Sequence, residues 1–83
     1  MHKLLISKQA EKELAGLPKQ ISKRLTVALD ELTTLGASAS NTKKLHTPFP
    51  GYRKRVGDYR ILFEVNEEII IIYRITKRSE AYR

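Results

Sequence analysis

The sequence predicts an α+β fold with the element order β-α-α-β-β-β, in which a helical hairpin packs on one face of a small, mainly antiparallel sheet. Two patterns support this prediction. Apolar residues recur about every 3.6 positions in the first half, as in amphipathic helices, and alternate with polar residues in much of the second half, as in half-buried strands. The chain has 83 residues, so we expect residues 1–83 to form a single domain.

The first half is predicted to contain one short strand and two helices. The apolar run at residues 2–7 suits a strand, and Ser7 is an expected N-cap for a helix over residues 8–16. A Gly-Leu-Pro segment separates this helix from a longer one that ends near residue 35. The longer helix has an apolar stripe at helical spacing, made of Ile21, Leu25, Ala28, Leu29, Leu32 and Leu35.

The second half is predicted to form an antiparallel meander of three strands. Residues 37–50 contain small polar residues and prolines, and we expect an irregular loop there. Residues 52–65 form a hairpin that turns at Gly57, because Gly-Asp is a preferred turn dipeptide. A second turn at residues 66–68 leads into a strand over residues 69–75, whose apolar residues on both faces indicate an interior place in the sheet.

Strand alternation divides the hairpin into an apolar face and a basic face. Arg53, Arg55 and Arg60 project opposite the helices, whereas Lys54 points to the helix side or the rim. Like charges on neighbouring strands destabilise a sheet, so their presence indicates a polyanionic partner. The net charge of +7 agrees, with most of the excess in residues 41–83. The alternative is a solvated basic surface that maintains solubility. The residues predicted to face the core are Tyr52, Val56, Tyr59, Ile61, Phe63, Val65 and Tyr73.

Composition argues against several other classes of protein. Without cysteine there is no disulfide, thiolate metal site or cysteine nucleophile. His2 and His46 are isolated and no acidic cluster lies on the basic face, so we expect neither a metal site nor a paired-histidine mechanism. No signal peptide and no apolar run long enough to span a membrane is visible, and we expect a cytoplasmic protein with no cofactor.

Two stretches carry a resemblance to a known family. G-Y-R-K-R-V-G-D-Y-R-I-L-F-E-V and the later Y-R-I-x-K-R-S-E-A-Y-R resemble the RelE toxins of the RelE/ParE superfamily, the toxin halves of type II toxin–antitoxin pairs. The likeness extends over essentially the whole chain. It implies a RelE-like fold and a metal-independent, ribosome-dependent mRNA endonuclease that cuts codons in the A site. It also implies inhibition by a RelB-like antitoxin, contact with operator DNA only through the antitoxin complex, and no membrane partner.

The resemblance also implies catalytic residues. These are basic residues on the sheet and an arginine and a tyrosine near the C terminus, which fall on Arg53, Arg55, Arg60, Arg78 and Tyr82. Well-known members have lysines where this chain has Arg53 and Arg55, and arginine is a poor general base, so the identity of the base stays open. The C-terminal helix of some relatives is missing, which leaves the mode of inhibition open. Further contacts to RNA phosphates are expected from Lys43, Lys44, Lys54, Lys77 and Arg83.

Two other functions fit the same residues. One is a ParE-like inhibitor of DNA gyrase without ribonuclease activity. The other is a catalytically inactive toxin homologue that acts only as a binding partner. Both keep the basic face and differ from the leading hypothesis in what that face binds.

Overall fold

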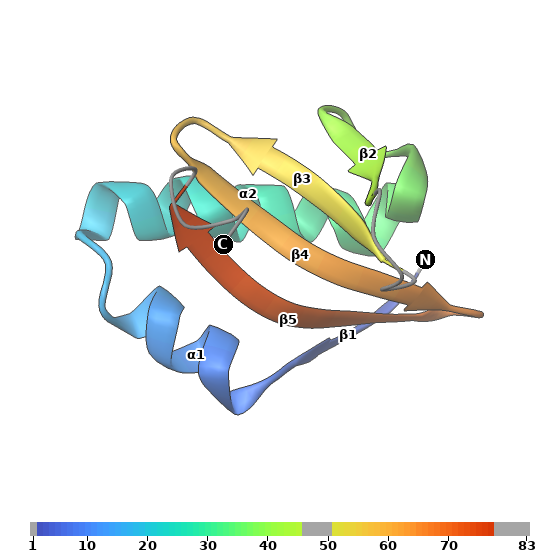
Figure 1. Ribbon diagram of the computed structural model, residues 1–83, viewed down its shortest axis with the longest axis horizontal. Coiled ribbons are helices and arrows are strands. Elements are labelled where there is room, and N and C mark those ends of the chain that lie inside the picture. The colour runs from blue at the N-terminus through green and yellow to red at the C-terminus, as the bar shows by residue number, and fades with distance from the viewer. Residues whose placement is uncertain (1, 46–50, 78–83) are drawn as a thin grey trace.

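The computed structural model describes residues 2–45 and 51–77 of the chain. Two helices pack against a five-stranded mixed sheet (Figure 1). In the described ranges, neither helix is long and apolar enough to cross a membrane. In chain order the elements are β1 (Lys3–Ile6), α1 (Lys8–Ala15), α2 (Lys19–Leu35), the 3-10 turn η1 (Gly36–Ser38), β2 (Thr42–Lys44), β3 (Tyr52–Val56), β4 (Tyr59–Asn66) and β5 (Ile69–Lys77).

The strand order across the sheet is β1-β5-β4-β3-β2. The strands β2 to β5 pair antiparallel, and β1 joins the sheet parallel to β5 after the chain has passed through both helices. This arrangement confirms the predicted α+β architecture and the interior place of β5. One expectation is wrong, because residues 42–44 of the predicted loop form the edge strand β2. A Thr-Lys-Lys segment has no alternation of apolar and polar residues, so the sequence pattern did not predict that it pairs with β3.

The helices begin and end largely where their capping residues predict. The Ser7 hydroxyl accepts a hydrogen bond from the Ala10 N–H at 3.0 Å and donates one to the carbonyl of Tyr73 at 2.8 Å, which caps α1 and attaches it to β5. The stripe of α2 buries Leu25, Ala28, Leu29 and Leu32. Leu35, predicted as part of this stripe, is 47% exposed, so the buried contact ends one turn before the helix does.

The core lies between α2 and the covered face of the sheet. Its largest fully buried side chains are Phe63, Leu25, Leu32, Ile61, Ile70 and Ile72. The ring of Tyr52 stacks on Phe63 with a centroid distance of 5.6 Å. Gly57 has φ of 60°, which the first residue of a two-residue hairpin loop requires and glycine tolerates best. The hairpin that orients the basic residues is therefore fixed by its core face and by its turn.

The edge of β5 changes partner halfway along its length. A register shift opposite Leu62 and Phe63 leaves Tyr73 as an extra residue, and the pairing with β1 ends at Ile72. Beyond that point Glu13 of α1 accepts hydrogen bonds from the Ile75 N–H at 2.8 Å and from Arg74 Nε at 2.9 Å. Burial raises the pKa of Glu13, but the hydrogen bonds from Arg74 and Ile75 outweigh it and hold this pKa below its ordinary value.

Candidate active site

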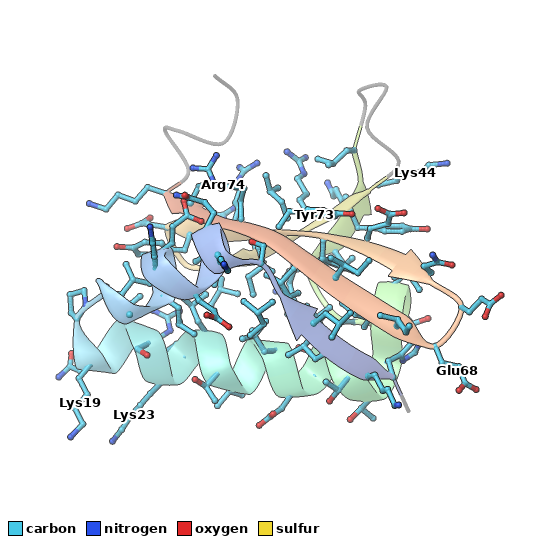
Figure 2. The ribbon with its side chains drawn as sticks, turned by 90° about the horizontal axis from the view of Figure 1, so that it is seen from below. Lys19, Lys23, Lys44, Glu68, Tyr73 and Arg74 are labelled. Carbon is cyan, nitrogen blue, oxygen red and sulfur yellow. The ribbon has the colours of Figure 1, made fainter. Side chains whose placement is uncertain are left out.

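The open face of the sheet, which is the face turned away from α2, carries the predicted arginines. Figure 2 shows both helices on one side of the sheet and the side chains of Lys44 and Tyr73 on the other. In β3 the residues Tyr52 and Val56 pack toward the core, so Arg53 and Arg55 point to the open face. In β4 Arg60 precedes the fully buried Ile61 and lies directly opposite Arg55. The three guanidinium groups share one face, as the alternation predicted.

These arginines line a pocket together with residues around β2. The pocket has a volume of about 190 Å³ and is bounded by Asn41, Lys43, Arg53, Arg55 and Arg60. Lys43 lies opposite Arg53 in the β2–β3 pair, and Arg55 lies opposite Arg60 in the β3–β4 pair. Two cross-strand pairs of cations therefore lie on this face of the sheet. Among the lining residues that the structure describes, none carries a carboxylate. The arrangement suits a ligand with several negative charges.

The pocket combines one sheltered cation, Arg60, with the exposed cations Lys43 and Arg55. Arg60 is only 7% exposed, and electrostatic interactions of a buried guanidinium are screened less than those of one in water. A guanidinium also binds two oxygens of one phosphate in a fork, which orients as well as attracts it. Arg55 donates from Nε to the carbonyl of Gly57 at 3.3 Å, which directs its side chain along the hairpin. These cations can hold a phosphate and stabilise negative charge that develops on it.

Two polar residues near the arginines were not predicted. The carbonyl of Asn41 accepts a hydrogen bond from the Arg55 N–H at 2.9 Å, and Asn41 has φ of 55°. Asparagine tolerates this left-handed conformation better than most residues do. The asparagine is therefore the one feature of the sequence that could have indicated a turn at this position. Thr76 lies opposite Arg60 across β4 and β5, is 4% exposed, and has a hydroxyl without a hydrogen-bond partner among residues 2–45 and 51–77. It shares the open face with the arginines.

Lys54 lies apart from the other residues predicted to contact RNA. Its side chain points to the helix side, as strand alternation indicated, and the residue is 2% exposed. Its ammonium pairs with Glu31 of α2 at 2.8 Å and donates to the carbonyl of Ser40 at 2.6 Å. The hydrogen bonds from Lys54 and Ser40 lower the pKa of Glu31 to about 2. A buried ammonium held in this way does not reach the open face, and we do not retain Lys54 as a phosphate contact.

Tyr73 does not face the core, contrary to the prediction. It lies on the open face, where its hydroxyl donates to Glu64 Oε2 at 2.7 Å (Figure 2). The hydrogen bond to Glu64, followed by burial, raises the pKa of Tyr73. The facing could not be read from the sequence here, because β5 has apolar residues on both faces. Tyr73 follows the buried Ile72, and the register shift after it changes the facing of the residues that follow.

The remaining predicted contacts are not gathered in the pocket. Lys44 is exposed at the end of β2 and is not among the lining residues. Lys77 lies opposite Tyr59 in the β4–β5 strand pair, and Tyr59 faces the helices. The side chain of Lys77 therefore leaves the sheet on the helix side, at the exposed end of β5. Arg78, Tyr82 and Arg83 lie outside the described residues. Among residues 2–45 and 51–77 there is no group of three or more side chains of the kinds that hold a metal ion.

Similarity to known proteins places the chain in a family. The family model described as the ParE toxin of type II toxin–antitoxin systems matches residues 4–82 of this chain. A curated relative, Toxin RelE3 of Methanocaldococcus jannaschii, is 35% identical, and the match covers 96% of this chain and 94% of that protein. Both comparisons extend over nearly the entire sequence, including the basic hairpin.

Solved structures agree in fold. The archaeal RelE–RelB complex of Pyrococcus horikoshii OT3 matches with a TM-score of 0.77 and 30% identity, covering 96% of this chain and 98% of that chain. The RelB–RelE complex of Methanococcus jannaschii matches with a TM-score of 0.77 and 32% identity, covering 94% of each chain. The isolated Escherichia coli RelE toxin, at 24% identity, shares the fold with a TM-score of 0.79, covering 99% of this chain and 92% of that chain. The chain therefore belongs to the RelE family of type II toxin–antitoxin toxins, within the RelE/ParE superfamily.

Proposed function

We propose that this toxin is a ribosome-dependent mRNA endonuclease that cuts codons in the ribosomal A site. The observation that carries the proposal is the pocket on the open face, where Lys43, Arg53, Arg55 and Arg60 come together and none of the described lining residues carries a carboxylate. A nucleic-acid backbone supplies the negative charges that such a cluster neutralises. RNA adds the 2′-hydroxyl, which serves as an internal nucleophile and removes the need for one on the protein.

The proposed reaction is a transphosphorylation within the RNA. The 2′-oxygen attacks the adjacent phosphorus, the bond from phosphorus to the 5′-oxygen breaks, and the products end in a 2′,3′-cyclic phosphate and a 5′-hydroxyl. Arg60 stabilises the charge that builds on the non-bridging oxygens, because it is the most buried of the pocket arginines. Arg53, Arg55 and Lys43 hold the backbone on either side, and no metal ion takes part.

Two protons must also move in this reaction. One leaves the 2′-hydroxyl and one reaches the departing 5′-oxygen. The guanidinium groups are poor proton carriers because arginine keeps its proton past about pH 12. Tyr82 is the candidate for this work, because a phenol can both release and take up a proton, and Arg78 is the candidate that supports it. Both assignments rest on the family resemblance.

Control by a RelB-like antitoxin is part of the proposal. Two solved relatives are complexes of RelE with RelB. A groove of about 630 Å³ between α1 and α2 is lined in part by apolar side chains and in part by polar ones, including Lys19 and Lys23, and it suits an acidic, amphipathic segment. Figure 2 shows both lysines pointing away from the sheet. Replacing both with glutamate should weaken neutralisation by the antitoxin and leave toxicity unchanged. Operator DNA is reached only through the antitoxin complex, and action on ribosomes puts the protein in the cytoplasm.

Sequencing RNA ends after brief induction tests the proposed activity. Wild-type toxin should produce new 5′-hydroxyl ends within translated codons and none in untranslated RNA. Arg60→Ala and Tyr82→Phe should remain folded and lose both the cuts and growth arrest, while Lys19→Ala, which removes a charge from the helix side, should keep both. If both site variants stay as toxic as wild type, the catalytic assignment is wrong.

The main alternative is inhibition of DNA gyrase, which the ParE description of the matching family model favours. In that case the same experiment gives intact transcripts together with DNA damage. A catalytically inactive homologue gives neither RNA cuts nor slower growth. Each function thus predicts a different pair of readings for RNA integrity and DNA damage.

A further inference from the structure

An ion pair between a buried lysine and a partly exposed glutamate ties three parts of the chain together beneath the pocket. The side chain of Lys54 is 3% exposed, and its ammonium contacts Glu31 at 2.8 Å and the carbonyl of Ser40 at 2.6 Å. The same carboxylate accepts hydrogen bonds from the Ser40 N–H at 2.8 Å and from the Ser40 hydroxyl at 2.9 Å. Ser40 is thereby bound through both its backbone groups and its side chain. We call these three residues the Ser40 clamp.

The chain immediately after Ser40 forms one wall of the cation pocket. Asn41 follows directly and accepts the Arg55 N–H, and Lys43 lies opposite Arg53. Both Asn41 and Lys43 line the pocket. The strand that carries Lys43 has three residues and lies at the edge of the sheet, with β3 as its single neighbour. So short an edge strand has few hydrogen bonds of its own and opens easily unless something else holds it.

We propose that Lys54 and Glu31 are positioning residues for substrate binding, which hold the wall of Asn41 and Lys43 at the pocket through Ser40. This inference rests on the proposed function, because it assigns to the wall a contact with the RNA backbone. Lys54 and Glu31 themselves lie on the other side of the sheet and touch no substrate. An apolar residue at position 54 would fill the same space but would leave the Ser40 carbonyl without its donor.

The choice of a charged pair fits a positioning role better than a stabilising one. A buried ion pair often adds little to stability compared with apolar residues of similar volume, but its fixed donors and acceptors select one arrangement. Here the arrangement selected is the path of residues 38–43, where the chain leaves α2 and returns to the sheet edge. The Ser40 clamp thus fixes the path of residues 38–43, and this path sets the position of the pocket wall.

A double-mutant cycle on RNA binding tests this connection. The probe is a short single-stranded RNA with 2′-O-methyl riboses, which the proposed reaction cannot cleave, and the readout is affinity as a function of salt. Lys43→Met should weaken binding several-fold and reduce the log–log salt slope by about one. Lys54→Met should reproduce most of this loss, and the double variant should bind no more weakly than Lys54→Met alone. Additive losses would overturn the proposal. Lys12→Met removes an equal charge from the exposed side of α1 and should change neither quantity.

Amide hydrogen exchange gives a second test that does not depend on RNA. Lys54→Met should speed hydrogen exchange of the Arg55 amide, which donates to the Asn41 carbonyl. The Ser7 amide, which donates to the Ile72 carbonyl in β5, should stay protected. If Lys54→Met does not fold, Glu31→Gln is the milder variant, because a glutamine still accepts from Ser40. Unchanged protection of Arg55 in a folded clamp variant would refute the clamp. If wild type does not bind the RNA probe, the assigned contact between the pocket and the RNA backbone is wrong, and the exchange result still decides the clamp.

Discussion

The two faces of strand β3 use the same charge in opposite ways. Three basic residues follow one another, and alternation sends Lys54 toward α2 and Arg53 and Arg55 to the open face. On the covered face the positive charge meets Glu31 and two hydrogen-bond acceptors within a few ångströms. On the open face the charges lie beside other charges of the same sign. The comparison shows that face, and not residue type, decides whether a basic residue serves the fold or the site.

The clearest way to break this comparison is to make the same substitution at neighbouring positions. Lys54→Met should lower the free energy of unfolding by about 2–3 kcal/mol, because Glu31 and Ser40 lose their partner. Arg55→Met should change it by less than about 0.5 kcal/mol or raise it, because a like-charge contact with Arg60 is removed. Urea unfolding followed by circular dichroism measures both. Equal losses at the two positions would show that the two faces do not differ in this way.

Acid unfolding should sharpen the comparison at the carboxylate of the clamp. The pKa of Glu31 is lowered from 4.5 to about 2, so its stabilising effect is complete above pH 4.5 and is lost as the pH falls through about 2. The expected loss is about 1–2 kcal/mol, since a side chain that is 30% exposed is partly screened by water. Glu31→Gln is the control because it lacks this titration. The difference between wild type and Glu31→Gln should therefore shrink over that range, and a constant difference would count against the assignment.

The smallest expected effect concerns the open face itself. Tyr73→Phe removes the hydrogen bond to Glu64 and should cost about 0.5–1.5 kcal/mol at neutral pH. The pKa of Tyr73 is raised, so the stability it contributes is present below pH 10 and is lost as the pH rises through the folded-state pKa. Wild type and Tyr73→Phe should approach each other in stability at high pH. Curves that stay parallel would indicate that the hydroxyl is not the titrating group.

Sequence reasoning reached those parts of the site that depend on local patterns. The alternation around Gly57 placed Arg53, Arg55 and Arg60 on one face, because a hairpin with a two-residue turn fixes both register and facing. It did not reach the wall formed by Asn41 and Lys43, which depends on an edge pairing without apolar alternation. It placed Tyr73 on the wrong face because β5 has apolar residues on both faces, so its sequence does not show which residues face the helices. The partner of Lys54 lies on a distant helix and was visible only after folding.

Ribosomal mRNA cleavage by three proteins tests the central claim most directly. Wild type, Arg55→Met and Lys19→Met are compared on purified ribosomes that present an mRNA codon in the A site. The two variants lose the same charge, one from the open face and one from the helix side. We predict that Arg55→Met slows cleavage by at least about tenfold while remaining folded, and that Lys19→Met cuts at the wild-type rate. Equal rates for Arg55→Met and Lys19→Met would contradict the claim that the arginines of the open face form the site for the RNA backbone.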